Sequence, residues 1–268
     1  MDAWICLNCC LEYPSAPRPP ESCPVCCDER VITPLEQRWI ASSELARGHR
    51  TELRPLEDGI TSVGVTPKVG IAQQAILVEL EAGCILWDCV PVLDEPAAAY
   101  VRARGGLEAV ALSHPHFYGA MAAWAEAFDA PILVHEKDRA WVTGPAAART
   151  QFWDGASYAL GGGATLVHCG GHFEGACVLH AARTADGAGA LLAGDTVMVL
   201  PNQLGAAFMR SYPRYVPLSL AAVDRIAERL APYAFERVYG AWFERVIPRE
   251  GKATIERAVR RYKDALAA

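Results

Sequence analysis

The chain has 268 residues, of which 52% are hydrophobic and 21% are charged. This length allows one substantial core of about 200 residues and a small additional module. The formal net charge of −6 gives no electrostatic support to general nucleic-acid binding. No apolar run reaches the roughly 18 residues of a membrane helix, and the chain starts without a signal-peptide pattern. We therefore expect a cytoplasmic protein with no membrane or nucleic-acid partner.

Residues 1–30 are rich in cysteine and contain two C-x2-C pairs, Cys6–Cys9 and Cys23–Cys26. Each C-x2-C turn directs two thiolates at one tetrahedral ion. The proline-rich segment between the pairs cannot form a core of its own, so the ion would supply the folding energy. The spacing predicts a structural zinc site with four cysteine ligands, similar to a zinc ribbon or a rubredoxin-like knuckle pair, with iron as the alternative metal.

Two further cysteines, Cys10 and Cys27, follow the pairs directly and are either spectators or alternative ligands. Residues 31–50 are expected to be a linker with one short helix, 42–47, which serines cap and Gly48 ends. Strands are then expected in four segments that turn residues separate: 51–56, 60–65, 74–81 and 84–90.

From residue 94 onward, predicted helices alternate with predicted strands. The helices are expected at 94–104, 120–128, 218–230 and 253–267. The strands are expected at 107–112, 130–135, 164–169, 176–182, 189–193 and 237–239. Residues 145–163 are expected to be loop, with the triple glycine 161–163 as a hairpin turn rather than a phosphate cradle. The pattern favours two sheets flanked by helices.

Two histidines one residue apart, His114 and His116, follow the predicted strand 107–112. Side chains at i and i+2 of an extended segment point the same way, so both imidazoles can face one cation. His172 and Asp195 also follow predicted strands, each directly after a glycine. Three histidines and a carboxylate are a typical ligand set for a transition metal, and we predict one metal ion at these four side chains.

The order of these motifs resembles the metallo-β-lactamase superfamily over about residues 50–268. In that family an H-x-H-x-D-H segment follows a strand, the third histidine lies in a G-G-H turn, and an aspartate follows in a G-D turn. The resemblance implies an α/β fold, a four-layer αββα sandwich over residues 51–268, with the metal at the sheet edges. It also implies that Asp88, after a strand of the first sheet, orients the metal site without binding the ion.

The chain departs from the family pattern at the second metal site. Tyr118 and Gly119 stand where the family has Asp-His, and Trp242 lies where the last histidine is expected. The second site therefore lacks its own ligands, and we expect a single zinc or iron ion. We expect the Tyr118 hydroxyl near the vacated position, where it can donate to a developing oxyanion. Trp242 is expected to narrow the substrate pocket.

A single ion with an open position lowers the pKa of a bound water, and Asp195 can take the proton of that water. The sequence therefore predicts a mononuclear zinc hydrolase that attacks an ester, thioester, amide or lactone in a small-molecule substrate. One alternative is a mononuclear non-haem iron oxygenase of the persulfide-dioxygenase type, which uses two histidines and one aspartate. The other is a non-catalytic module that binds metal or recruits a partner. The oligomeric state is open, with a homodimer as one option.

Overall fold

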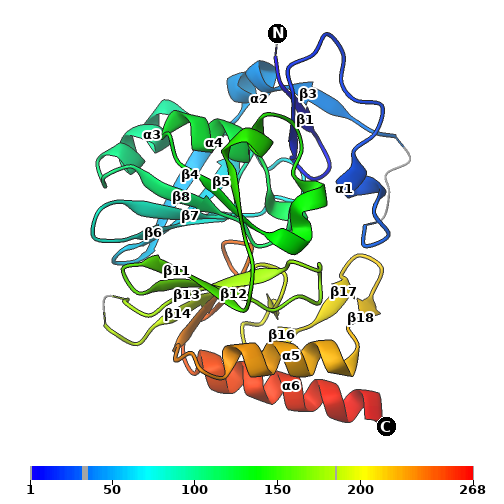
Figure 1. Cartoon of the computed structure of the whole chain (residues 1–268), viewed down its shortest axis with the longest axis vertical. Helices are drawn as coiled ribbons and strands as arrows, with labels where there is room; N and C mark the ends of the chain where they lie inside the picture. The colour runs from blue at the N-terminus through cyan, green and yellow to red at the C-terminus, as the bar shows by residue number, and fades with distance from the viewer. Residues whose placement is uncertain (1, 32–35, 185, 268) are drawn as a thin grey trace.

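Two β-sheets lie face to face between two layers of helices in the computed structural model (Figure 1). The structure describes residues 2–31, 36–184 and 186–267. One helical layer contains α3 (Glu95–Arg102) and α4 (Met121–Ala127), and the other contains α5 (Leu220–Leu230) and α6 (Gly251–Ala267). The predicted four-layer αββα sandwich is confirmed.

The first sheet has seven strands in the order β10-β9-β8-β7-β6-β5-β4. Their bounds are β4 (Arg50–Glu57), β5 (Ile60–Thr66), β6 (Ala75–Glu79), β7 (Cys84–Trp87), β8 (Leu107–Ala111), β9 (Ile132–His135) and β10 (Thr150–Trp153). Strands β4 to β7 pair antiparallel, whereas β7 to β10 pair parallel through crossovers that include α3 and α4. The carboxyl ends of β7 and β8 therefore meet at one edge of the sheet.

The second sheet has six strands in the order β11-β12-β13-β14-β19-β20. Their bounds are β11 (Ser157–Gly161), β12 (Ala164–His168), β13 (Cys177–Ala181), β14 (Ala190–Leu192), β19 (Arg237–Tyr239) and β20 (Val246–Ile247). Only the β14–β19 pair is parallel among these described strands, and α5 lies in its crossover. Gly161, Gly162 and Gly163 all have positive φ and join β11 to β12, as the predicted hairpin turn requires.

Alternating side chains of the strands build three cores, one for each pair of neighbouring layers. In β7, Ile85 and Trp87 point between the two sheets, whereas Cys84 and Leu86 point toward the layer of α3 and α4. On the other side, Val178 of β13 packs in the cluster that the second sheet shares with α5 and α6. Burial on both faces explains why the central strands are nearly continuous apolar runs.

The crossover helices α3 and α5 begin at side-chain caps. The Asp94 carboxylate accepts a hydrogen bond from the Ala97 amide at 3.1 Å, and the Ser219 hydroxyl accepts one from the Ala222 amide at 3.3 Å. Such caps satisfy amide groups that have no partner within the helix. The starts of both helices therefore follow from local sequence, within two residues of the predicted boundaries.

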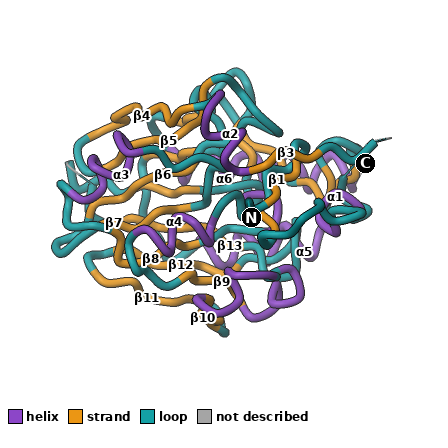
Figure 2. The backbone as a smooth tube through the Cα atoms, turned by 90° about the horizontal axis from the view of Figure 1, so that it is seen from above, coloured by secondary structure: helices purple, strands orange, loops and turns teal. Residues whose placement is uncertain are grey.

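The N-terminal module is a three-stranded sheet, β2-β1-β3, with two short helices, and it lies toward one end of the two large sheets (Figures 1 and 2). Its elements are β1 (Trp4–Cys6), β2 (Glu12–Tyr13), α1 (Pro24–Cys27), β3 (Trp39–Ala41) and α2 (Ser42–Gly48). Strand β3 comes from the segment predicted as a linker, residues 31–50, of which 32–35 lie outside the described residues. The module packs in the same core cluster as Trp124 of α4.

The prediction of loop over residues 145–163 was wrong in part, because the segment contains β10 and β11. Both are edge strands, at the ends of the first and second sheets. In β11, Ser157 to Ala159 are exposed, so the strand lacks the apolar alternation that marks a buried face. A short edge strand of this kind leaves little hydrophobic signal in the sequence.

Short elements complete the fold. The 3₁₀ helices are η1 (Pro115–Phe117), η2 (Glu136–Trp141) and η3 (Gly144–Arg149). Between β14 and α5 lie two small ribbons, β15 (Met198–Val199) with β16 (Ala206–Ala207) and β17 (Met209–Ser211) with β18 (Val216–Pro217). Among the described residues, no helix combines the length and the apolar character that crossing a membrane demands.

Candidate metal centres

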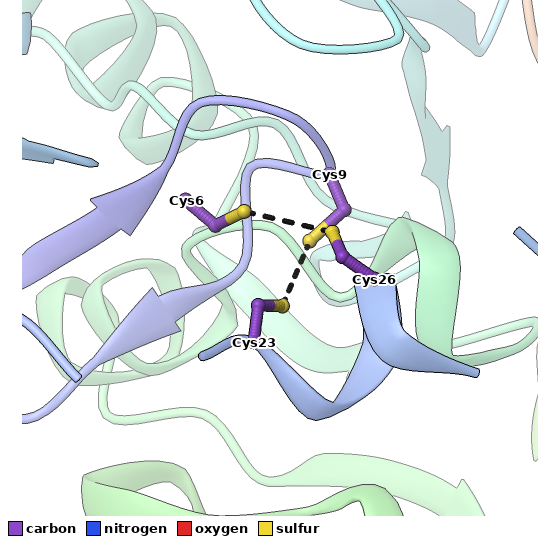
Figure 3. Close-up of side chains that lie close together, drawn as sticks. All are labelled: Cys6, Cys9, Cys23 and Cys26. Carbon is purple, nitrogen blue, oxygen red and sulfur yellow. Dashed lines mark hydrogen bonds between the residues drawn. The ribbon is translucent and has the colours of Figure 1, made fainter. Parts of the chain in front are cut away.

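Four cysteine side chains of the N-terminal module converge on one point (Figure 3). The Cys6 sulfur lies 3.6 Å from that of Cys26, and the Cys9 sulfur lies 3.6 Å from that of Cys23. An ion with tetrahedral metal–sulfur bonds of about 2.3 Å separates its sulfurs by about 3.8 Å. The spacing fits one ion and is too long for a disulfide bond.

Polar groups of the module surround these sulfurs. The Tyr13 hydroxyl donates to the Cys23 sulfur at 3.1 Å, and the Asn8 amide donates to the Cys26 sulfur at 3.2 Å. Hydrogen bonds among the four thiols lower the pKa of Cys23 but raise the pKa values of Cys9 and Cys26, because adjacent thiolates repel one another unless a cation lies between them. All four cysteines are 5% exposed or less. A closed set of four thiolates is typical of a structural zinc site.

The structure separates Cys10 and Cys27 from this cluster. Neither belongs to the group of four sulfurs that lie within 4.8 Å of one another. Cys10 is buried, which raises its pKa to about 12 and keeps it a neutral thiol, whereas Cys27 is exposed. Of the two roles left open by the sequence, the geometry therefore favours spectators over ligands.

A second cluster brings together His114, His116, His172 and Asp195, the four residues that the sequence singled out. The first two follow β8, the third lies in the turn between β12 and β13, and the aspartate follows β14. The four residues therefore come from both sheets. The amide of Cys177 in the second sheet donates to the Ser113 carbonyl beside the first sheet at 3.0 Å, and this hydrogen bond joins the two sheet edges. The site is thus a product of the sandwich topology.

The four ligand atoms surround a space that fits one ion. Nε2 of His172 lies 3.3 Å from Nδ1 of His116. Oδ2 of Asp195 lies 3.6 Å from Nε2 of His114 and 3.8 Å from Nε2 of His172. Nitrogen and oxygen ligands at about 2.0–2.1 Å from a tetrahedral zinc ion lie about 3.3–3.4 Å apart. The cluster is therefore close to the dimensions of a single metal site.

A chain of hydrogen bonds orients His114. The Asp88 carboxylate accepts a hydrogen bond from the Ser113 amide at 2.8 Å, and the Ser113 hydroxyl lies 2.8 Å from Nδ1 of His114. With Nδ1 bonded in this way, Nε2 of His114 is directed at the cluster. Asp88 has a φ of 60°, a left-handed conformation that Asp tolerates better than most residues. The orienting role of Asp88 stays a prediction, and Ser113, which the sequence did not reveal, is the residue through which Asp88 would act on His114.

His172 is held from its other side. Its Nδ1 lies 3.0 Å from the carbonyl oxygen of Met209 in β17 and donates to it, so Nε2 carries a lone pair. Nδ1 of His116 lies 3.3 Å from that lone pair, a distance that suits a hydrogen bond between the two nitrogens or a cation shared by them. Nε2 of His114 and Oδ1 of Asp195 are buried and have no hydrogen-bond partner among the described residues. A buried imidazole nitrogen without a partner, 3.6 Å from Oδ2 of Asp195, fits a metal ion between the two side chains.

Burial sets the charge state of these side chains. It lowers the pKa of His114 to about 3 and that of His172 to about 4, and it lowers that of His116 well below the usual range. The positive charge of Arg30 adds to the lowering at all three histidines. The imidazoles are therefore neutral at neutral pH, the form that binds a metal. Burial raises the pKa of Asp195 to about 6.

The residues that replace the second-site ligands are large or lack a ligand atom. The Tyr118 side chain is 1% exposed, and its hydroxyl has no hydrogen-bond partner within the described part of the chain. Burial raises the pKa of Tyr118 well above its usual range, so the hydroxyl stays a donor. Trp242 contacts Phe117 with ring centroids 6.2 Å apart, and Phe117 contacts His114 at 4.4 Å. The indole N–H of Trp242 donates to the Ile71 carbonyl at 2.9 Å.

Arg30 is a part of the site that the sequence did not reveal. It is 4% exposed, and its Nε donates to the backbone carbonyl of His172 at 2.8 Å. Its guanidinium lies 4.2 Å from the ring centroid of Phe173, which contacts His116 at 4.9 Å. An isolated arginine after a cysteine motif carries no local signal for a contact 142 residues away, so only the structure identifies it.

An αββα sandwich with three histidines and an aspartate at the meeting edge of its sheets defines a class of metal-binding proteins with a hydrolase-type fold. The family model described as the metallo-beta-lactamase superfamily matches residues 70–242, more than half of the chain. The chain belongs to this superfamily, and the family that its motifs resembled is confirmed.

Individual relatives agree with this result. A protein of Bacillus subtilis (strain 168) described as "Uncharacterized protein YmaE" is 36% identical, over 99% of this chain and 97% of its own length. The crystal structure of the DIM-1 metallo-beta-lactamase exposed to ceftazidime superposes with a TM-score of 0.60 at 14% identity, over 81% and 98% of the two chains. The Cronobacter sakazakii enzyme with the HARLDQ motif gives 0.51 at 17% identity, over 80% and 92%. At these identities the two structures show a shared fold alone.

Proposed function

We propose that this chain is a mononuclear metal-dependent hydrolase, with zinc as the ion, that cleaves an ester, thioester, amide or lactone in a small molecule. The observation that carries the proposal is the convergence of three neutral histidines and Asp195 on a space that fits one ion. The family's second-site positions hold Tyr118, Gly119 and Trp242 in this chain. A single bound zinc ion would supply a water activated near neutral pH.

Asp195 is the candidate proton acceptor. Its Oδ2 faces His114 and His172, while its Oδ1 has no partner among the described residues. The free oxygen can take a proton from the attacking water while the other holds the site together. Asp195 and His116 are 7% and 9% exposed, whereas His114 and His172 are each 1% exposed. Asp195 and His116 are therefore the two ligands that keep the most exposed surface.

A cavity of about 740 Å³ beside Trp242 is the candidate substrate pocket. Its lining includes apolar Met198 and Phe243 and the basic side chains of Arg54, Lys68 and Arg245. The rings of Trp242 and Phe117 lie between this cavity and His114, and Trp242 limits the cavity on that side. The acidic side chains of Glu52 and Glu244 also line it, so a small organic substrate would meet both apolar walls and charges of both signs. The proposed role of the Tyr118 hydroxyl is to donate to the oxyanion that forms on that substrate.

Metal content and turnover of the purified full chain test the proposal. Mass spectrometry of the zinc-loaded protein should find two ions per chain, and a panel of esters, thioesters, amides and lactones should contain a substrate. His172→Ala should retain one ion and lose turnover, whereas His49→Ala, outside both clusters, should retain both ions and full turnover. Tyr118→Phe with undiminished turnover would remove the hydroxyl from the mechanism.

Three results would overturn this function. Turnover that survives His172→Ala places the chemistry elsewhere. Iron at the histidine site, with oxygen consumption on a persulfide and no hydrolysis on the panel, favours an oxygenase of the persulfide-dioxygenase type. Zinc at the cysteine site alone, after full repletion, favours a non-catalytic module.

A further inference from the structure

We propose that Arg30 couples the two candidate metal centres, so that the metal-loaded cysteine knuckle holds the loop of His172 in its metal-binding position. Arg30 is in this sense a positioning residue. The inference rests on the proposed function only in requiring that the histidine cluster binds a metal; it does not require that the protein hydrolyses anything.

The first observation is the burial of Arg30 within a complete set of partners. Its Nη1 pairs with the Asp28 carboxylate at 2.9 Å, and its Nη2 pairs with the Glu174 carboxylate at 2.8 Å. A guanidinium that is 5% exposed is costly to desolvate unless such partners compensate it. Because Asp28 lies in the N-terminal module and Glu174 in the turn of His172, these ion pairs join the two centres.

The second observation is the short, rigid connection from the cysteine knuckle to Arg30. Cys26 lies in α1, and Asp28 is the residue that ends this helix. The Asp28 carboxylate accepts the Arg30 amide at 2.8 Å, and the Asp28 carbonyl accepts the Val31 amide at 3.0 Å. This tight turn leaves little freedom between the cysteine ligand and the guanidinium, so the knuckle determines where Arg30 lies.

The third observation is a closed ring of contacts around His172. Arg30 donates to the backbone carbonyl of His172 at 2.8 Å, and Nδ1 of His172 donates to the Met209 carbonyl at 3.0 Å. Two residues further along β17, the Ser211 hydroxyl donates to the Arg30 carbonyl at 2.7 Å. His172 is thus held between Arg30 and β17, while β17 also holds Arg30. Displacement of Arg30 would open this ring on one side.

The direction of the effect separates positioning from simple electrostatics. The positive charge of Arg30 repels a cation, so its removal alone would strengthen metal binding at the histidine cluster. Its contacts hold a ligand loop in place, so their removal weakens metal binding, by about 10- to 100-fold for groups that orient a metal ligand. The proposal therefore predicts a loss of affinity where electrostatics predicts a gain.

The experiment measures the zinc dissociation constant of the histidine cluster in the full chain, by competition with a chelator, while the cysteine site stays loaded. Cobalt substitution distinguishes the two sites, because thiolate ligands give charge-transfer absorption that nitrogen and oxygen ligands lack. Arg30→Ala should raise the dissociation constant about 10- to 100-fold and leave the thiolate absorption unchanged. Arg30→Lys keeps the positive charge but loses the planar guanidinium, so it should not restore the zinc affinity of the histidine cluster.

Two further variants keep the proposal testable if Arg30→Ala fails to fold. Glu174→Gln removes one partner whose side chain is 58% exposed, and should raise the dissociation constant several-fold. Arg183→Ala removes an ion pair with Glu81 on the surface and should change nothing. A dissociation constant that is unchanged or lower in Arg30→Ala, or in Glu174→Gln where Arg30→Ala does not fold, would overturn the proposal.

The second arm removes the ion from the knuckle itself. Cys23→Ser should raise the dissociation constant of the histidine cluster about as much as Arg30→Ala does. Because both changes act through the same contacts, the double variant should bind zinc no more weakly than either single variant. Effects that add, or a Cys23→Ser protein that is folded and has an unchanged histidine cluster, would show that the centres are independent.

Discussion

The two metal-ligand clusters of this protein are built in opposite ways. All four cysteines lie within the first 26 residues, in two C-x2-C turns, whereas the histidines and Asp195 come from strand ends of two different sheets. The cysteine cluster needs only a short stretch of sequence, which contains all four candidate ligands. The histidine cluster forms only when the two sheets have packed together, because neither sheet alone carries all four residues.

The surroundings of the clusters differ as well. The sulfurs are closed off at 5% exposure or less, and Tyr13 and Asn8 donate hydrogen bonds to them. In the histidine cluster, Nε2 of His114 and Oδ1 of Asp195 lack partners among the described residues, and Asp195 retains a small exposed surface. A closed, satisfied set suits a structural ion, whereas an unsatisfied set with one accessible side suits chemistry.

The largest effect on stability is expected from removing a ligand of the cysteine cluster. Cys23→Ser should lower the free energy of unfolding by ~3 kcal/mol or more, a part of the roughly 10–16 kcal/mol with which structural zinc ions bind. In a chain of this size the melting temperature should fall by about 10 °C, which calorimetry can measure. Cys27→Ser is the matched control, since this exposed thiol lies outside the cluster. Equal melting temperatures for the two variants would contradict a structural ion.

The unsatisfied cluster should respond differently to the loss of a ligand. His172→Ala should lose one ion per chain, yet the melting temperature of the metal-free protein should fall by only a few degrees. The physical reason is that the sandwich is held by three apolar cores, none of which includes the histidine ligands. Metal analysis combined with thermal unfolding checks both parts. A collapse of the fold in His172→Ala would show that this cluster is structural too.

A smaller effect is expected where a residue only orients a ligand. Asp88→Ala should weaken zinc binding at the histidine cluster about 10- to 100-fold, because Ser113 loses its acceptor and His114 loses its support. Asp88→Asn keeps an acceptor oxygen and tolerates the φ of 60°, so its affinity should stay close to that of the unmodified protein. Chelator competition measures both. If Asn binds zinc as weakly as Ala, the carboxylate charge rather than the hydrogen bond is responsible.

The smallest effect on stability is expected at Tyr118, which lies where the family has a ligand of the second metal ion. Tyr118→Phe removes a buried hydroxyl that has no partner among the described residues, and it leaves the ring in the core. The free energy of unfolding should rise by about 1 kcal/mol, because an unpaired polar group no longer has to be desolvated. Denaturant unfolding of the metal-free protein measures this. A loss of stability instead would mean that the hydroxyl has a structural partner, such as an ordered water.

Local spacing explains what could be predicted from the sequence. The C-x2-C pairs, the His114-x-His116 pair and the glycine turns before His172 and Asp195 each bring chemistry together within a few residues. Apolar runs between turn residues located ten of the thirteen described strands of the two large sheets, because strands with a buried face are rich in hydrophobic residues. The family resemblance then supplied the sandwich that connects these pieces.

Contacts between distant segments explain what could not be predicted. Strand β3 completes the N-terminal sheet from a segment that reads as a linker, since three residues beside a charged stretch show no periodicity. Ser113 and Arg30 act through contacts with backbone groups and side chains that no sequence pattern predicts. Edge strands β10 and β11 were missed for a related reason, because each pairs on one side only and needs little apolar surface.

The cysteine module precedes the sandwich in the chain, and this order has a consequence for how the protein is made. The ribosome releases all four cysteines long before His172 and Asp195, and domains generally fold from the N-terminus during synthesis. The knuckle can therefore capture its ion while the sandwich is still incomplete. Arg30 would then be in place before the turn of His172 arrives against it, so the order of synthesis would also be the order in which the two metals are acquired.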